Sequence, residues 1–442
     1  MWYNEFMDIF IGVIVGLIVL MLLVTLHEFG HFLAARQSGV NVLEFGIGFP
    51  PRAIAWIKDP KTHKWRKLKK SEWGETGVMN TVMSENKDVA KTTKSKVSIK
   101  HEKEKLIKDG LMFSLNWLPI GGFCQMDGES AEDERPGTFG HAKFWAKTKI
   151  LFAGVAMNWL VGFVILTILA WTGMPTFLNN QFTVESDTRT DESVVTVTEV
   201  VENSPAAKAG FIAGDIIVSI DNEAVTRASD VTKYNNEHAG EEVKYKILRR
   251  GEEGCNCDTN EELVVTLNDS GAEYLLGVAM SAPQALSYST WSAPIVGAGL
   301  TLQITSETFK GVGELVWNLV SGVGRMFSFD AGVRESGQAA ISSVGDSVSG
   351  PVGIIGVLFP SFTAAGPTNL AFLAALISIS LACMNVLPIP ALDGGRWLLI
   401  AIYKIRGKKL TKETEQKIVS RAMFALLAIF AIVTILDIVR FF

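Results

Sequence analysis

The sequence has 442 residues, of which 48% are hydrophobic and 20% are charged, and its mean hydropathy is +0.25. This balance is too apolar for an ordinary soluble protein and indicates a membrane protein. The formal net charge of -5 gives no sign of a nucleic-acid partner. There are four cysteines and no Cys-x-x-Cys pair, which argues against a disulfide framework and against a cysteine-type zinc site.

Four stretches are long and apolar enough to cross a bilayer, which takes about 20 residues. They are residues 9–35, 150–173, 368–388 and 419–438. The first stretch has no basic leading segment and no small-residue cleavage site, so we interpret it as a retained helix rather than a signal peptide.

Lysine and arginine are concentrated after the first span and before the last one, whereas the middle region, about 174–367, contains many Asp and Glu residues. Under the positive-inside rule the two basic loops face the cytoplasm and the middle region lies outside. Four crossings allow this arrangement only if both chain termini also lie outside.

The first span ends in TLHEFGHFLAAR, which carries His27, Glu28 and His31. Residues four apart lie on one face of a helix, so both imidazole rings can reach one zinc ion. In an HExxH arrangement the glutamate takes a proton from a water molecule that zinc has made acidic. Ionisable groups in a membrane helix are costly unless a partner offsets them. The pattern predicts a zinc site, and the alternative is a pair of histidines at the level of the lipid headgroups.

A hydrolytic zinc site takes three protein ligands and keeps a fourth position open. The other four histidines lie in polar segments, so the third ligand is expected to be a carboxylate in or near the membrane. Asp393, in NVLPIPALDGG, is the only acidic residue for many positions on either side. Pro388 and Pro390 interrupt the preceding helix, which lets the backbone direct this carboxylate inward. We therefore predict a His-His-Asp site.

The segment APIVGAGLTLQITSETFKGVGELVWNLVSGVGRMF is a fifth apolar stretch, but it contains Glu307, Lys310 and Glu314. Its apolar residues recur at helical spacing, which fits an amphipathic helix at the outer membrane surface better than a fifth span. The alternative is an ordinary packed surface helix.

The pair HEFGH and NVLPIPALDGG resembles the two signature motifs of the site-2 protease family of intramembrane zinc metalloproteases. The likeness is to the bacterial branch that includes the regulator of sigma-E protease. EFGIGFPPRAIAW and MFSLNWLPIGGFCQM resemble the membrane-associated β-hairpins of this family, KTKILFAGVAMNWLVGF resembles its second core helix, and SGPVGI precedes the third. The resemblance implies that His27, His31 and Asp393 bind zinc, that Glu28 is the general base, and that Asn385 positions the substrate or stabilises the oxyanion.

A peptide bond in a transmembrane helix must unwind before water can attack it. The glycine-containing hairpins, including Gly122, are expected to accept the unwound stretch as an added strand, which satisfies its backbone groups where water is scarce. We also assign Pro388 and Pro390 to substrate binding.

The stretch VVTVTEVVENSPAAKAGFIAGDIIVSIDNEAV resembles bacterial PDZ domains and predicts one such domain at 190–282, where some relatives carry two. The segment EYLLGVAM, with Gly277, is expected to offer a strand edge to an extended peptide. A purely steric role is the alternative. In this family, the resemblance implies, such domains admit only substrates whose outer parts have been trimmed. A second departure is a Lys-rich insertion at 58–110, which we interpret as a solvated cytoplasmic loop near anionic lipid.

The predicted fold is a polytopic α-helical membrane protein with about four transmembrane helices, membrane-associated β-hairpins and one extracytoplasmic PDZ domain. The expected parts are the N-terminal half of the membrane core (1–173), the PDZ domain (190–282), an amphipathic outer-surface region (283–366) and the C-terminal half of the core (367–442). By the resemblance, the chain lies in the bacterial inner membrane, and the topology from the positive-inside rule puts its active site toward the cytoplasmic side.

The predicted function is intramembrane zinc-dependent proteolysis of single-span membrane proteins, without a nucleic-acid partner. The family implies anti-sigma factors or remnant signal peptides as substrates. The alternatives are a divalent-metal transporter and a non-catalytic PDZ scaffold. A transporter would distribute its ligands along a path across the bilayer, and a scaffold would not need Glu28 beside paired histidines, so the protease is favoured.

Overall fold

The computed structural model describes residues 2–58, 64–68, 111–130, 132–178, 180–190, 195–225, 228–249, 259–272, 274–281, 286–347 and 350–441. The chain divides into two compact units. The first unit consists of Met1–Ile168 and Gly297–Phe442, and the second unit is Leu169–Val296. We call them the membrane unit and the sheet unit.

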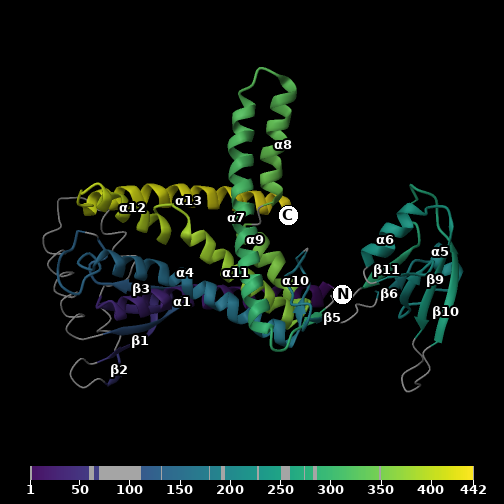
Figure 1. Ribbon diagram of the computed structural model, residues 1–442, viewed down its shortest axis with the longest axis horizontal. Helices are drawn as coiled ribbons and strands as arrows, with labels where there is room; N and C mark the ends of the chain where they lie inside the picture. Colours follow the sequence, from purple (N-terminus) through teal and green to yellow (C-terminus); the bar gives the residue numbers. More distant parts are fainter. Residues whose placement is uncertain are drawn as a thin grey trace. The chain divides into compact units, whose positions relative to one another are not determined.

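Helices dominate the membrane unit (Figure 1). The long ones are α1 (Trp2–Gln37), α4 (Phe144–Thr172), α7 (Ala293–Met326), α8 (Ala331–Ser347), α11 (Pro367–Val386), α12 (Asp393–Ile405) and α13 (Lys412–Phe441). Between α8 and α11 lie the short helices α9 (Pro351–Gly353) and α10 (Phe359–Ala364), joined by π-helical residues Ile354–Leu358. Four helices are long and apolar enough to cross a membrane: Ile9–Gln37, Phe144–Thr172, Pro367–Val386 and Lys412–Arg440. The four predicted spans are thereby confirmed.

Glycines allow the helices of this unit to approach closely. Gly12 and Gly16 of α1 lie directly against Pro360 and Phe359 of α10, and Gly30 of α1 lies against the backbone of α4. A side chain at any of these positions would collide with the neighbouring helix. Such small-residue contacts are typical of membrane helices, whose association is not driven by the hydrophobic effect.

The helix α7 changes character along its length. Its first half presents a buried stripe, which consists of Ala293, Val296, Leu300 and Ile304. Thr305 accepts a hydrogen bond from the indole nitrogen of Trp159 on α4 (2.9 Å). In its second half Trp317 and Val320 are exposed, and α8 runs beside it as the other arm of a helical hairpin (Figure 1). The position of this hairpin at the outer membrane surface stays a prediction.

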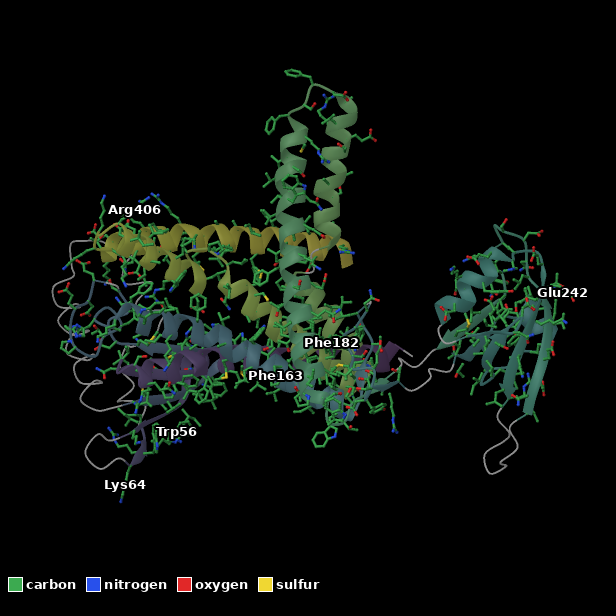
Figure 2. All side chains as sticks on the ribbon, viewed as in Figure 1. Trp56, Lys64, Phe163, Phe182, Glu242 and Arg406 are labelled. Carbon is green, nitrogen blue, oxygen red and sulfur yellow. The ribbon has the colours of Figure 1, made fainter. Side chains whose placement is uncertain are left out.

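The two predicted hairpins interlock into one antiparallel sheet. Its strands are β1 (Val42–Lys58), β2 (Trp65–Lys67) and β3 (Met112–Met126). Ile47 pairs with Gly122 and also with Leu115, so the first arm of β1 lies between the two arms of β3. Of the predicted insertion 58–110, residues 64–68 are described and contain β2, which pairs with β1; residues 59–63 and 69–110 lie outside the described residues. Trp56 and Lys64 project from this part of the sheet (Figure 2).

A buried ion pair links the two arms of β1 across the bend between Phe49 and Arg52. The guanidinium of Arg52 donates from Nε to Glu44 Oε1 (2.9 Å) and from Nη2 to Glu44 Oε2 (2.5 Å). Glu44 is 1% exposed and Arg52 is 9% exposed. The amide of Asn116 donates to the carbonyl of Gly48 (3.1 Å) and ties the bend to β3. Charge-assisted hydrogen bonds of this kind fix a geometry that apolar contacts alone would leave loose.

The sheet unit is built on a twisted antiparallel sheet with the strand order β10-β9-β7-β6-β11. The strands are β6 (Val195–Val200), β7 (Ile216–Ile220), β9 (Glu242–Arg249), β10 (Thr259–Thr266) and β11 (Val278–Ser281), and β8 (Glu223–Ala224) pairs with β7. Two helices accompany them, α5 (Pro205–Ala209) and α6 (Ala228–Glu237). A small separate sheet consists of β4 (Met174–Pro175), β5 (Arg189–Thr190) and β12 (Leu286–Tyr288).

Apolar side chains that alternate along the strands form the core of the sheet unit. Val195, Ile217, Tyr245 and Ile247 are at most 1% exposed. The buried hydroxyl of Tyr245 donates to Asn235 Oδ1 (2.5 Å), so its polar atom is satisfied. This alternation is the period-2 pattern of a half-buried strand.

Candidate metal centre

The last turns of α1 bring two imidazole rings to one buried face. His27 is 8% exposed and His31 is 6% exposed, and their Nε2 atoms lie 3.1 Å apart. Glu28, on the same turn, has a carboxylate oxygen within 4.8 Å of ring nitrogens of both histidines. These three side chains form a group that can hold a metal ion.

A carboxylate from the far end of the sequence joins this group. Asp393 Oδ2 lies 3.1 Å from His27 Nε2 and 3.3 Å from His31 Nε2. A tetrahedral zinc ion with bonds of about 2.0 Å has its ligand atoms about 3.3 Å apart. The donor types and the spacing of the three atoms therefore fit zinc.

The backbone between α11 and α12 explains how Asp393 arrives there. The stretch between Val386 and Asp393 is not helical, and its amides bond within the stretch, as in Ile389 N to Leu387 O (2.8 Å). Gly394 and Gly395 lie against the carbonyls of Val386 and Ile389, where any side chain would collide. The two glycines thus allow α12 to begin directly against the broken segment.

Two side chains anchor the first turn of α12 beside Asp393. Arg396 donates from Nε to Glu415 Oε1 on α13 (3.2 Å) and from Nη2 to the carbonyl of Glu129, and its guanidinium lies 5.0 Å from the Phe139 ring centroid. On the other side, the indole of Trp397 donates to Thr148 Oγ1 on α4 (2.9 Å). These contacts fix α12 relative to α4, α13 and the loop after β3.

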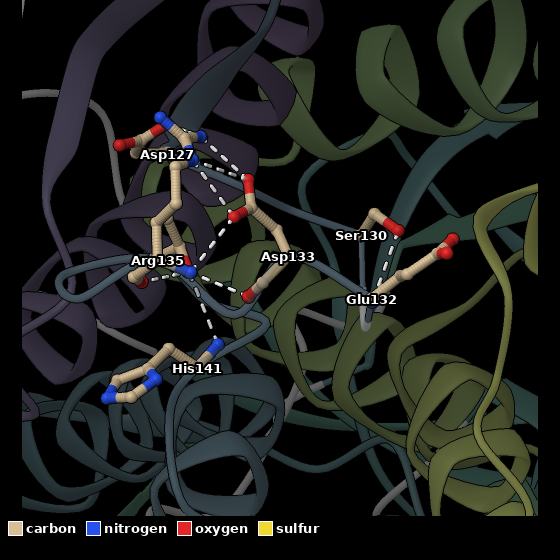
Figure 3. Close-up of polar contacts among 7 residues, drawn as sticks. Asp127, Ser130, Glu132, Asp133, Arg135 and His141 are labelled. Atoms are coloured by element: carbon tan, nitrogen blue, oxygen red, sulfur yellow. Dashed lines mark hydrogen bonds and ion pairs between the residues drawn. The ribbon is translucent and has the colours of Figure 1, made fainter.

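That loop is shaped by its own ion pairs (Figure 3). Arg135 Nη2 donates to Asp133 Oδ2 (2.6 Å) and to Asp127 Oδ1 (3.2 Å). The hydrogen bond to Asp133 is the main cause that raises the pKa of Arg135 above its ordinary value, and the hydrogen bond to Asp127 adds to it. The guanidinium therefore stays charged. The loop buries Phe139 completely and presents the carbonyl of Glu129 to the first turn of α12.

A glycine on α4 provides the space for the two imidazoles. A Cβ atom at Gly154 would lie 2.5 Å from His31 Nε2 and 2.7 Å from His27 Nε2. One turn earlier on α4, the carbonyl of Ile150 pairs with His31 Nδ1 (2.8 Å). A carbonyl can only accept, so Nδ1 carries the proton and Nε2 keeps its lone pair for a metal.

The edge of the hairpin sheet holds the remaining carboxylate. The backbone N–H of Cys124 on β3 donates to Glu28 Oε2 (3.1 Å). Two residues earlier, a Cβ at Gly122 would lie 3.0 Å from Thr25 Oγ1, so β3 runs directly beside α1. One oxygen of Glu28 is therefore fixed by the sheet.

The other residues predicted for the site are not shown in contact with the four side chains of the metal centre in the described structure. The Asn385 amide donates to Leu381 O, one turn back on α11 (3.0 Å). Pro388 and Pro390 lie in the non-helical stretch that leads to Asp393. Gly277 belongs to the sheet unit, where its backbone has φ +79° and its carbonyl accepts from Val201 N (2.9 Å). The structure thus brings together His27, Glu28, His31 and Asp393, and it shows no contact that joins Asn385 to them among the described residues.

Sequence reasoning missed two residues of the site, Gly154 and Arg396. A signal for Gly154 exists, because Gly154 and Gly162 flank Asn158 at intervals of four and mark one face of α4. Nothing local marks Arg396, whose partners lie on α13 and on the loop after β3.

Comparison with known proteins identifies the family. The model of peptidase family M50 matches residues 15–69 and 89–430. The chain is similar to the probable protease eep of Enterococcus faecalis, with 27% identity over 97% of this chain and 99% of that protein. It is also similar to the zinc metalloprotease RasP of Bacillus licheniformis, with 28% identity over 97% of this chain and 99% of the relative. The regulator of sigma-W protease RasP of Bacillus subtilis is 26% identical over 98% of this chain and its own full length. Because the family match covers most of the chain, this protein belongs to peptidase family M50, the site-2 protease family of intramembrane zinc metalloproteases.

Proposed function

We propose that His27, His31 and Asp393 are the zinc ligands of this protease and that Glu28 is its general base. The observation that carries this proposal is the convergence of three ligand atoms at 3.1–3.3 Å with a carboxylate beside them. Bound zinc supplies Lewis acidity, which polarises a carbonyl and makes water a better acid.

The chain itself moves the proton. The Cys124 amide holds Oε2 of Glu28, which leaves Oε1 to take a proton from the attacking water and to deliver it to the leaving amide nitrogen. Asp393 and the histidines are held by α12, α4 and α1, so the reacting groups need little rearrangement.

We propose that the substrate lies as an extended strand along β3 at Gly122, beside the turn that carries Glu28. Strand addition would satisfy the backbone groups of an unwound transmembrane segment. Pro388 and Pro390 would line the same region from the segment before Asp393. Asn385 would exchange its bond to Leu381 O for one to the substrate carbonyl and so stabilise the oxyanion.

We propose further that residues 190–282 form an extracytoplasmic PDZ domain that admits only trimmed, single-span substrates. The sheet order, the short helix α5 and the loop at Gly277 support this assignment. The charge distribution of the loops supports its position outside the bacterial inner membrane, with the metal centre toward the cytoplasm. The name of the Bacillus subtilis relative, regulator of sigma-W protease, supports a substrate of the anti-sigma class.

The test is cleavage of a model single-span membrane protein by the purified chain and by Glu28→Gln, with zinc content measured in both. We expect Glu28→Gln to keep its zinc and to lose about a thousandfold in rate, the size of a general-base contribution. Glu335→Gln, a change of the same kind at an exposed position on α8, should cleave like the parent. Equal cleavage by Glu28→Gln would contradict the assignment of the base. Zinc bound in both proteins without cleavage of even a trimmed substrate would favour a metal transporter or a scaffold.

A further inference from the structure

A polar residue lies inside the helix bundle one turn from the metal centre. Asn158 of α4 is 1% exposed. It lies on the same face as Gly154, which contacts the imidazoles of α1, and Gly162, which contacts Ile379 of α11. The backbone carbonyl of Asn158 accepts a hydrogen bond from Ser378 Oγ of α11 (2.8 Å). Asn158 therefore lies where α1, α4 and α11 meet.

Two buried polar atoms in this region are without a hydrogen bond in the described part of the chain. They are Asn158 Oδ1 and His27 Nδ1. Leaving a buried donor or acceptor unpaired costs about 1–3 kcal/mol, and more where water is scarce. A polar residue kept at such a cost inside a membrane bundle points to a function.

The packing of α1 against α4 places these two side chains at neighbouring levels of the helix interface. His31 pairs with Ile150 and His27 contacts Gly154, so the two helices run antiparallel in steps of four residues. The next step places Asn158 opposite the turn of Leu23. Helical side chains lean toward the N-terminus of their own helix. The ring of His27 thus leans toward the level of Asn158, while the carboxamide of Asn158 leans toward the space left by the missing side chain of Gly154.

The two atoms are also complementary. When His27 Nε2 faces a metal, Nδ1 carries the ring proton and is a donor, whereas Asn158 Oδ1 is an acceptor. Histidine ligands of metals almost always donate this second N–H to an oxygen, which orients the ring. His31 has such a partner in the Ile150 carbonyl, and His27 has none in the remainder of the described site.

We infer that Asn158 is a positioning residue for His27, whose Nδ1–H it accepts through one buried water molecule. The contact holds Nε2 of His27 toward the metal. This inference rests on the proposed metal centre and assigns to Asn158 a role in zinc affinity rather than in substrate binding.

The experiment measures the zinc dissociation constant of the full chain in detergent by competition with a chelator. Asn158→Leu keeps the volume of the side chain and removes the acceptor, and we expect it to raise the dissociation constant by about 10- to 100-fold. Asn158→Asp keeps an acceptor oxygen and should stay within about threefold of the parent. Asn369→Ala is the matched control, because Asn369 on α11 also has a buried Oδ1 without a partner in the described chain, and it should bind zinc like the parent.

Two outcomes of the zinc measurement would overturn the inference. One is an Asn158→Leu protein that binds zinc as tightly as the parent, and the other is an Asn158→Asp protein that binds as weakly as Asn158→Leu. The cobalt-substituted proteins give a second readout, since a reoriented ligand shifts the visible absorption bands in Asn158→Leu. An increase in KM with unchanged zinc affinity and an unchanged cobalt spectrum would show a substrate contact instead and would also overturn it.

His31→Ala separates this inference from the proposed metal centre. If the parent binds zinc and His31→Ala does not, the centre stands, and the Asn158 variants alone decide the present inference. If His31→Ala binds zinc like the parent, the ligand assignment itself fails.

Discussion

The interior of the sheet unit and the interior of the membrane unit are stabilised by different kinds of contact. In the sheet unit, Val195, Ile217, Tyr245 and Ile247 form an apolar core with almost no exposed surface. The sheet unit also buries polar side chains, such as Asp215 and Asn235. In the membrane unit, however, the closest contacts between helices run through glycines, and several buried positions also carry polar side chains. These polar positions include Glu44, Arg52, His27, His31, Asn158 and Asp437.

The difference follows from the two solvents. Water drives apolar side chains together in the sheet unit. Lipid tails are as apolar as leucine, so helices in a membrane associate through close packing and through polar contacts. Added volume or a lost polar partner should therefore damage the membrane unit most, whereas lost apolar volume should damage the sheet unit most.

The largest effect is expected from one methyl group at the centre of the membrane unit. Gly154→Ala places a Cβ where His27 and His31 now lie, so two of the three proposed ligands must move. We expect the zinc dissociation constant to rise by at least about a thousandfold, or 4 kcal/mol. Zinc retained after dialysis against graded chelator concentrations measures this change.

A glycine on α7 supplies the control for this substitution. A Cβ at Gly313 has no heavy atom within 4 Å, so Gly313→Ala should bind zinc like the parent. If Gly154→Ala also keeps its zinc, close packing of α1 and α4 does not place the histidines, and the contrast between the two units loses its main support.

Some residues of the metal centre could be predicted from the sequence and others could not, and the apolar character of the membrane helices explains the difference. The spacing of His27 and His31 is local, and Asp393 is conspicuous as a lone carboxylate in an apolar segment, so all three could be predicted. Gly154 was missed although Gly154, Asn158 and Gly162 recur at intervals of four, because nothing in the apolar sequence of α4 shows that this face meets α1. Asn158 was hidden for the same reason.

In the β structure, too, some features could be predicted from the sequence and others could not. Alternating residues predict β6 within the sheet unit, and the resemblance to site-2 proteases predicts the two hairpin segments of the membrane unit. The interlocking of β1 and β3 depends on one arm pairing with two partners, as Ile47 does with Leu115 and Gly122. Such pairing is set by tertiary contacts, and no local pattern encodes it.

An intermediate effect is expected in the core of the sheet unit. Ile247 is fully buried, and Ile247→Ala should destabilise this unit by about 3 kcal/mol through lost burial and a cavity. Hydrogen exchange of the β7 and β9 amides in the full chain measures the change. The zinc dissociation constant should stay at the parent value.

The same substitution at an exposed position of a candidate membrane span is the control. Ile435 of α13 is 60% exposed, and in Ile435→Ala lipid can fill the lost volume. We expect that variant to unfold like the parent. A loss of stability equal to that of Ile247→Ala would mean that burial against protein does not distinguish the two positions.

The smallest effects on stability are expected from substitution of two aspartates that both accept hydrogen bonds from backbone amides at a helix start. One aspartate lies in each unit. Asp437 of α13 is 3% exposed and accepts from the amides of Gly350 (3.0 Å) and Gly353 (2.9 Å) at the start of α9. Asp187 of the sheet unit accepts from the amides of Thr290 (2.8 Å) and Ser292 (3.0 Å) at the start of α7. Asp437→Asn should cost about 2 kcal/mol, because one oxygen is lost where no water replaces it.

Asp187→Asn should cost less than Asp437→Asn, since water can replace the lost acceptor at a partly exposed site. Hydrogen bonds from the hydroxyls of Ser292 and Thr290 and from their amides lower the pKa of Asp187. The stability it contributes is therefore complete above the unfolded pKa of about 4 and is lost as the pH falls through the lower, folded pKa. After correction for intrinsic rates, the amides of Thr290 and Ser292 should exchange faster at pH 3 than at pH 5 in the parent, and Asp187→Asn should lack this dependence. Equal destabilisation by the two Asn variants would mean that water reaches Asp437 as readily as Asp187, and that the two units do not differ in solvent at these helix starts.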